Sequence, residues 1–157
     1  MRDNASSAGN QQERLSVLPP EYIVGLVDGE GYFSITTRID SSKPYRSFRV
    51  QMVFGIKLKE GDGGILYDLQ RTFGCGIIRK RVDDRPTFSD CLEYQVRDFE
   101  AIKKVIIPFF KQYSLRIGSK QRSFEKFVEI ADLFEKGLHL QARGFQRVKM
   151  LAKRLHR

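Results

Sequence analysis

Hydrophobic and polar residues alternate along four stretches of the chain, which form two pairs. The first pair covers Tyr32 to Ile39 and residues 47–57, and the second covers Gly76 to Val82 and Cys91 to Arg97. A period of two places apolar side chains on one face of a strand and polar side chains on the other. Because a short polar loop joins the members of each pair, we predict two antiparallel hairpins, each with one buried and one open face.

Helical spacing of apolar residues alternates with these hairpins. The expected helices run from Pro20 to the glycines at 29 and 31, from Ile65 to Phe73, from Phe99 to about Tyr113, from Ser119 to Glu135 and from Phe145 to about His156. Asp62, Asp98 and Ser119 have the side chains of helix caps and stand where three of these helices begin. Pro108 lacks a backbone donor and predicts a kink or a split in the third helix, and Gly137 ends the fourth.

The order of elements defines the fold class. Helix, hairpin, helix, hairpin and helix follow one another, so we expect an α+β domain with an αββαββα core. Four antiparallel strands form its sheet, helices cover one face, and additional C-terminal helices follow the core. The chain has 157 residues, of which we assign 18–157 to this single domain and 1–17 to a disordered N-terminal tail.

The charge balance points to a polyanionic partner. Lys and Arg number 28 against 19 Asp and Glu, which leaves a formal net charge of +9. The expected basic C-terminal helix, within residues 138–157, adds six Lys and Arg and no acidic residue, and we expect it to contact backbone phosphates of nucleic acid. Charge that serves only solubility is the alternative.

The two cysteines and the N-terminal stretch indicate an intracellular protein. Cys75 lies opposite residue 97 in the expected second hairpin, too far along the strand from Cys91 for a disulfide. We therefore expect free thiols in a reducing compartment. No apolar run reaches the ~18 residues that a membrane span needs, and the first 17 residues lack the apolar centre of a secretory signal.

Glycines and acids are concentrated at the end of the first helix. Gly25 and Gly29 stand four residues apart on one helical face, where the missing side chains allow a second helix to approach closely. Two such helices side by side bring their terminal acids together, and these carboxylates repel one another and the negative end of the helix dipole. A divalent cation relieves that repulsion, and Mg²⁺ favours carboxylate, water and phosphate oxygens.

The stretch from Ile23 to Gly31 resembles, position by position, the LAGLIDADG signature of homing endonucleases. The positions that match outright are Gly25, Leu26, Asp28 and Gly31. Glu30 replaces the last acid of the signature conservatively, and Gly29 is the small residue between the two acids. The helix–hairpin order is also similar to the αββαββα core of that family, so the resemblance spans roughly residues 20–135.

This resemblance implies a function and its site residues. The chain is expected to make metal-dependent double-strand breaks in double-stranded DNA at a long, near-palindromic site. Because it holds one copy of the motif, it is expected to act as a homodimer, with Gly25, Asp28 and Gly29 in the interface. Glu30 is expected to be catalytic and to bind the metal, with Gly29 as a second metal-binding residue. The expected metal is Mg²⁺, and Mn²⁺ is expected to substitute for it. Asp28 has the more structural role.

Two further segments extend the resemblance. Leu115 to Lys120 resembles the segment that delivers an active-site lysine, which makes Lys120 a catalytic candidate; a solvated lysine in a first helical turn is the alternative. Some relatives place a polar active-site residue at the end of the second strand, where this chain has Leu58. A shift of one residue puts Lys57 there instead, so this assignment stays open.

The polar faces of the two hairpins form the expected DNA surface. A two-stranded ribbon fits the major groove, where Arg pairs with guanine and Gln with adenine. The candidate DNA-binding residues are Ser34, Thr36, Arg38, Arg49, Gln51, Lys57, Arg79, Arg81, Gln95 and Arg97. An ordinary solvated sheet face is the alternative, but it does not explain this density of arginine.

The sequence gives no support for other nuclease or zinc sites, but it leaves two alternative functions open. No Asp or Glu stands two residues before a Lys, and His139 and His156 do not have the spacing of a zinc site. A catalytically idle relative, either a DNA-binding regulator or an intron RNA maturase, is the main alternative function. A basic module that binds RNA shape is a third, but it requires exposed aromatics, whereas the aromatics here fall mostly on apolar faces.

Overall fold

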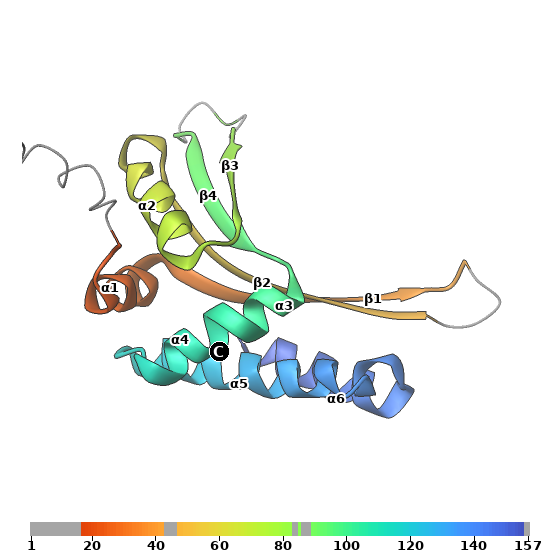
Figure 1. Ribbon diagram of the computed structural model, residues 1–157. Coiled ribbons are helices and arrows are strands. Elements are labelled where there is room, and N and C mark those ends of the chain that lie inside the picture. The colour runs from red at the N-terminus through yellow and green to blue at the C-terminus, as the bar shows by residue number, and fades with distance from the viewer. Residues whose placement is uncertain (1–16, 43–46, 83–84, 86–88, 156–157) are drawn as a thin grey trace, which may run out of the picture.

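The computed structural model describes residues 17–42, 47–82, 85 and 89–155 (Figure 1). The expected disordered tail lies outside them, apart from Val17. The helices are α1 (Pro20–Glu30), α2 (Gly64–Phe73), α3 (Phe99–Ala101), α4 (Ile107–Gln112), α5 (Gly118–Glu135) and α6 (Ala142–Lys153), with short η1 (Glu60–Asp62), η2 (Ile102–Ile106) and η3 (Leu138–Leu140). The strands are β1 (Gly31–Asp40), β2 (Ser47–Lys59), β3 (Ile77–Arg81) and β4 (Cys91–Val96).

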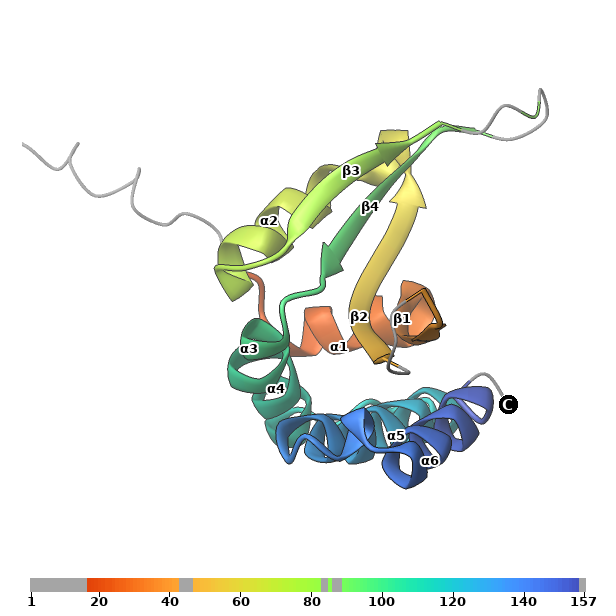
Figure 2. The same ribbon diagram turned by 90° about the vertical axis from the view of Figure 1, so that its right-hand side faces the viewer.

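The four strands form one antiparallel sheet in the order β1-β2-β4-β3. Both expected hairpins are confirmed, and pairing of β2 with β4 joins them into the predicted α+β sheet. Figure 2 shows α5 and α6 lying together along one side of the β1–β2 hairpin, while α2 packs beside β3 and β4. In the part of the chain that the structure describes, none of the helices combines the length and the apolar character needed to cross a bilayer.

Phenylalanine side chains join the sheet to the helices. Phe33 of β1 is 2% exposed and lies within 5.1–6.0 Å, between ring centroids, of four other rings. Those rings are Phe54 of β2, Phe110 of α4, and Phe124 and Phe127 of α5. Because the alternation puts Phe33 and Phe54 on the same face, directly opposite in register, the apolar face of the hairpin becomes the centre of the core.

The two ends of α1 follow from its sequence. Pro20 occupies the first helical position, as predicted, where its missing N–H costs no hydrogen bond. At the other end the chain passes directly from the helix into β1 at Gly31. A Cβ atom on Gly31 would lie 2.6 Å from Val27 Cγ1 and 2.8 Å from the Val27 carbonyl oxygen, so only glycine permits this close turn. The motif acids therefore lie at the junction of helix and sheet.

The expected helix ends were partly right. Asp98 caps α3 through a hydrogen bond from the Ala101 N–H to its carboxylate, 2.9 Å long. The segment before Pro108 opens into the π-helical turn η2, so the expected helix is split as predicted. Asp62 and Ser119 were wrongly assigned as caps, because Asp62 lies in η1 and Ser119 lies inside α5, which begins at Gly118.

Candidate functional site

Helix α1 has one buried and one open face. Ile23, Val24 and Val27 point into the core and are at most 6% exposed. Gly25 and Gly29 lie on the exposed side. Apart from the chain neighbours and the nearby backbone of α1 itself, no atom of the described residues lies within 4 Å of a Cβ placed on either glycine. This chain therefore leaves room for another helix along that face, as the spacing of the glycines predicts.

Asp28 holds the segment that leads into α5. Its carboxylate accepts hydrogen bonds from the backbone N–H groups of Arg116, at 3.0 Å, and Ile117, at 3.2 Å. The side chain from α1 thus stabilises the start of α5 in place of the predicted Ser119. This contact gives Asp28 the structural role that was expected for it; a place in a dimer interface stays a prediction.

The same arrangement brings Lys120 to the end of α1. Lys120 lies in the first turn of α5, and its ammonium group donates a hydrogen bond to the carbonyl oxygen of Gly31. Glu30 immediately precedes that glycine, and its side chain is exposed. Lys120, 90 positions from Glu30 in the sequence, is therefore held at the residue that follows Glu30, and the catalytic roles of both stay predictions.

The oxygen ligands at this junction are of the kind that a hard cation binds, but one chain supplies too few of them. Within the described ranges, no group of three or more His, Cys, Asp and Glu side chains is placed to hold a metal ion. One chain supplies the Glu30 carboxylate and carbonyl oxygens such as that of Gly29, which lies in the last helical turn where carbonyls lack intrahelical partners. These oxygens fit Mg²⁺ in kind, and a second copy of the junction would bring their number closer to what the ion requires.

Lys57, not Leu58, belongs to the polar face of the sheet. Leu58 packs against the core, whereas Lys57 is exposed and lies opposite Glu93 in the β2–β4 register. Lys57 also lines a cavity of about 300 Å³ together with Arg81 and Glu93. The structure therefore favours Lys57 over Leu58 for the polar position that the sequence left open, and its role there stays a prediction.

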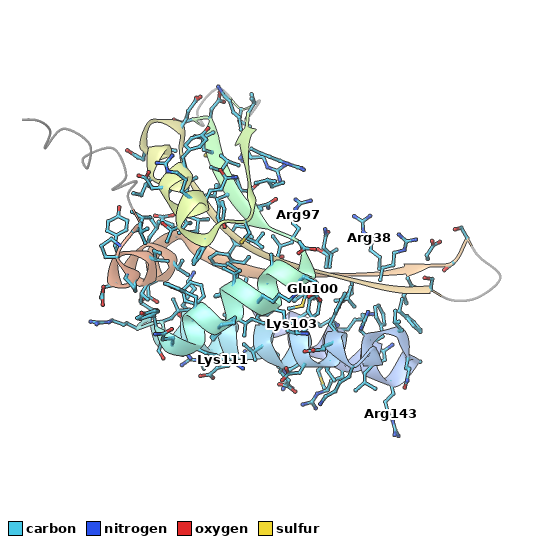
Figure 3. The ribbon with its side chains drawn as sticks, viewed as in Figure 1. Arg38, Arg97, Glu100, Lys103, Lys111 and Arg143 are labelled. Carbon is cyan, nitrogen blue, oxygen red and sulfur yellow. The ribbon has the colours of Figure 1, made fainter. Side chains whose placement is uncertain are left out.

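The polar face of the sheet presents most of the predicted DNA-binding side chains. The exposed residues among them are Thr36, Arg38, Arg49, Gln51, Lys57, Arg79, Arg81 and Arg97, and Ser34 is half-buried. Thr36, Arg38, Arg49 and Gln51 also line a hollow of about 590 Å³ that Phe134 and His139 of the helical segments share. Figure 3 shows Arg38 and Arg97 pointing to the same side of the sheet. The cationic side chains are thus gathered on one surface.

Gln95 departs from this pattern. It is only 6% exposed, because the Tyr32 ring reaches across the sheet and its hydroxyl oxygen accepts a hydrogen bond from Gln95 Nε2 at 2.6 Å. The expectation that Gln95 lies open on the face is wrong for this structure. Tyr32 also donates to Glu93 Oε1 at 2.7 Å, so the buried carboxylate and the buried amide share one phenol.

Burial and hydrogen bonding shift the pKa values in this cluster in opposite directions. Burial is the largest cause that raises the pKa of Tyr32 to about 12, so the hydroxyl stays protonated at neutral pH. Burial also acts to raise the pKa of Glu93. Hydrogen bonds from Tyr32 and Arg81 outweigh that effect and hold the Glu93 pKa below its ordinary value. The carboxylate is therefore charged and the phenol neutral.

Sequence reasoning overlooked Tyr32 and Glu93 as members of the site. Tyr32 is an aromatic residue at an even-numbered position of β1, the parity of Ser34, Thr36 and Arg38, where the alternation calls for a polar side chain. Its register partner is Gly55, a glycine inside a strand. An aromatic residue opposite a strand glycine indicates close packing across the sheet, and this signal was available in the sequence.

The basic C-terminal segment lies elsewhere. Phe145 of α6 stacks on Phe48 of β2, with ring centroids 4.6 Å apart, which holds α6 against the hairpin. Figure 3 shows Arg143 of α6 pointing away from the side to which Arg38 and Arg97 point. Contact of the whole segment with backbone phosphates stays a prediction.

The site residues fall within a region shared with known proteins. The sequence profile of the LAGLIDADG endonuclease family matches residues 23–131. A probable intron-encoded endonuclease 2 of Neurospora crassa is 33% identical over 133 residues, which cover 83% of this chain and 28% of that protein. This chain therefore spans little more than a quarter of the length of that curated relative.

Solved structures show the same fold. A homing endonuclease named I-TnaI superimposes with a TM-score of 0.76 at 31% identity, over 87% of each chain. I-SmaMI, solved bound to an uncleaved DNA target in the presence of calcium ions, also gives a TM-score of 0.76, at 29% identity. That alignment covers 86% of this chain but 44% of I-SmaMI, so this chain corresponds to less than half of the larger protein.

Proposed function

Because the chain belongs to the LAGLIDADG endonuclease family, we propose that it is a site-specific endonuclease that makes metal-dependent double-strand breaks in DNA. The observation that carries this proposal is the hydrogen bond that holds Lys120 at Gly31, next to Glu30 in the chain and beside a helix face left open at Gly25 and Gly29. A carboxylate, an ammonium group and an open helix face at one junction suit a phosphodiesterase site that a second copy completes.

The proposed active form is a homodimer. One motif helix per chain places one Glu30 at the junction, and a two-fold axis along the open face of α1 would bring the two Glu30 side chains together. The alignment with I-SmaMI, which covers less than half of that chain, is in keeping with two such units acting together. A two-fold protein presents the same surface twice, so the matching DNA site is near-palindromic.

The residues of this chain have separable tasks in the proposed reaction. The paired Glu30 carboxylates would hold Mg²⁺ or Mn²⁺, which when bound supplies Lewis acidity and activates water. The Lys120 ammonium group, held at Gly31, contributes fixed positive charge where the scissile phosphate gains negative charge. Asp28 keeps the start of α5, and therefore Lys120, in place.

The polar face of the sheet is the proposed DNA surface. Its exposed arginines and the net charge of +9 favour a duplex, and two-stranded ribbons fit the major groove. Each phosphate contact releases counterions, so the logarithm of the association constant should fall by about 0.9 per contact for each tenfold rise in salt. An enzyme that acts on the DNA of its own cell must work inside that cell. We therefore propose an intracellular location.

Cleavage of a randomised duplex library tests the proposal. Sequencing the cut ends after incubation with Mg²⁺ should recover one long, near-palindromic site, and EDTA should abolish cutting. Ca²⁺ should support binding with little cleavage, because its looser coordination positions water poorly. A protein that selects a DNA sequence without cutting it in Mg²⁺ or Mn²⁺ would instead be the binding regulator, and one that selects only structured RNA would be the maturase.

A further inference from the structure

A chain of hydrogen bonds on the polar face of the sheet connects two arginines. Arg97 Nε donates to Gln95 Oε1 at 2.9 Å, and Gln95 Nε2 donates to the Tyr32 hydroxyl at 2.6 Å. Tyr32 donates to Glu93 Oε1 at 2.7 Å, and Arg81 Nε donates to Glu93 Oε2 at 2.6 Å. Side chains from β1, β3 and β4 and the residue after β4 therefore form one continuous cluster, which we call the Tyr32 cluster.

Only one arrangement of donors satisfies this cluster. A guanidinium group can only donate and a carboxylate can only accept. The Gln95 oxygen must therefore face Arg97, its NH₂ group must face Tyr32, and the Tyr32 proton must point to Glu93. The oxygen and the NH₂ group of the Gln95 amide and both carboxylate oxygens of Glu93 take part in hydrogen bonds. The Tyr32 hydroxyl acts both as donor and as acceptor. Each side chain is consequently held in one orientation.

The backbone of β2 is adapted to this cluster. Gly55 lies between Tyr32 and Gln95 in the register of the three strands. A Cβ atom on Gly55 would lie 2.4 Å from the Tyr32 hydroxyl oxygen and 2.5 Å from Tyr32 Cζ, so any side chain there would displace the phenol. Because Gly55 leaves the surface of β2 bare, Tyr32 can span the strand and reach β4.

The cluster leaves the terminal guanidinium nitrogens of Arg81 and Arg97 without a partner inside the cluster. Each guanidinium group is bound through Nε, which leaves its two terminal nitrogens for other acceptors. The Arg81 side chain is 49% exposed, and Arg97 is exposed and points to the same side as Arg38 (Figure 3). The two terminal nitrogens form the fork that binds O6 and N7 of guanine in the major groove. Preorganising the fork lowers the entropy lost on binding.

On the basis of the proposed function, we infer that Tyr32, Gln95 and Glu93 are positioning residues that set Arg81 and Arg97 to read guanines at two different base pairs near the cut. The cluster is close to the proposed cleavage centre because Tyr32 follows Glu30 by two residues. Glu93 and Gln95 are two residues apart on β4, about 7 Å along the strand, so the two arginines reach separate base pairs.

The first arm of the test needs no DNA. In the ¹⁵N-labelled free protein, the Nε–H groups of Arg81 and Arg97 should exchange with water more slowly than that of Arg79, an exposed arginine two residues before Arg81 on β3. Tyr32→Phe should accelerate exchange at Arg97 and Arg81 while keeping the ring over Gly55. Exchange at Arg81 and Arg97 as fast as at Arg79 in the unaltered protein would show that the cluster does not hold them.

The second arm measures base preference by competitive binding to a randomised duplex library. Arg81→Lys and Arg97→Lys should each lose the roughly 5- to 150-fold discrimination of one bidentate guanine contact, and thereby mark its position. Tyr32→Phe and Glu93→Gln should weaken preference at those same positions, with an unchanged salt dependence because no phosphate contact is removed. Tyr67→Phe, which removes an exposed hydroxyl from α2, is the control and should change nothing.

The two arms separate this inference from the proposed function. If exchange shows the cluster and Tyr32→Phe keeps the original preference at every position, the positioning role is wrong while the nuclease proposal stands. If exchange shows the cluster and the unaltered protein prefers no sequence, both the proposed function and the reading role are wrong. Loss of preference confined to the Arg81 and Arg97 positions supports the inference.

Discussion

The two faces of α1 differ in how many packing and hydrogen-bonding partners this chain supplies for them. On the inner face, Val27 is fully buried and both oxygens of Asp28 accept backbone hydrogen bonds. On the outer face, Gly25, Gly29 and Glu30 are exposed. Two acids only two residues apart therefore have different surroundings, one supporting the fold and one directed to solvent. The inner face is complete within one chain, whereas the outer face is suited to a partner helix and a cation.

Glu30→Gln tests the outer acid and should have the largest effect. The amide keeps the shape of the side chain but cannot attract a divalent ion as a carboxylate does. The several kcal/mol that a bound metal contributes correspond to a loss of cutting on the order of 10,000-fold. Gel assays should show that DNA binding is retained. Glu21→Gln changes an exposed acid in the first turn of the same helix and should cut normally; an equal loss in both variants would contradict the assignment.

Gly25→Leu tests the open face itself. The leucine meets open space within one chain, and replacing a glycine inside a helix favours folding by up to about 1 kcal/mol. In a dimer, however, overpacking occurs once from each subunit, which costs about 2–6 kcal/mol, or roughly 30- to 20,000-fold in dimer affinity. Light scattering should therefore find monomers of normal thermal stability that cut poorly. Gly61→Leu, also in open space but on η1, should leave the dimer intact.

Lys120→Met removes the charge that α5 delivers to the junction. Losing one fixed electrostatic contact to a developing charge commonly slows an enzyme about 100-fold, and we expect that loss in single-turnover cutting. Metal binding at Glu30 should persist, as measured by titration. Lys126→Met is the matched control, because Lys126 also lies on α5 and donates to a backbone carbonyl, that of Arg154. Equal rates for Lys120→Met and the unaltered enzyme would remove Lys120 from the mechanism.

Asp28→Asn tests the inner acid and should have the smallest effect. Asparagine can accept one of the two backbone hydrogen bonds but brings no charge, so about 1–2 kcal/mol of stability should be lost. That corresponds to a fall in Tm of roughly 2–8 °C by calorimetry. Cutting should slow only a few-fold, through a less firmly held Lys120. Asp132→Asn, an exposed acid on α5, is the control. A loss of cutting as large as that of Glu30→Gln would show that Asp28 acts directly.

Local pattern was sufficient for the strands and for the motif helix. Both hairpins, the Pro20 start of α1 and the Asp98 cap depend on contacts between residues close in sequence, and the structure confirms them. Phe33 and Phe54 could also be assigned to the core, because a period of two decides the face of every strand residue. Resemblance to the family then selected Glu30 and Lys120, although neither residue's spacing by itself indicates catalysis.

The partners of the side chains at the site did not follow from the alternation of polar and apolar residues alone. Ser119 has the side chain of a cap, yet the backbone ahead of α5 is bound by Asp28, 88 residues away from Arg116. Gln95 alternates correctly onto the polar face, but a phenol 63 residues away covers it. The first pair depends on how α1 packs against the start of α5 and the second on which strands become neighbours in the sheet, and periodicity carries no information about either.

The sequence by itself determined which face of each strand is apolar, where α1 begins, and which residues carry the family motif. Only the tertiary structure decided that Asp28 supports α5, that Lys120 reaches Gly31, and that Tyr32 ties Gln95 to Glu93. It also decided that Arg143 of α6 points away from the polar face (Figure 3). The physical reason is that burial of an apolar face depends on local order along the chain, whereas a polar side chain takes whichever partner the completed packing brings within hydrogen-bonding distance.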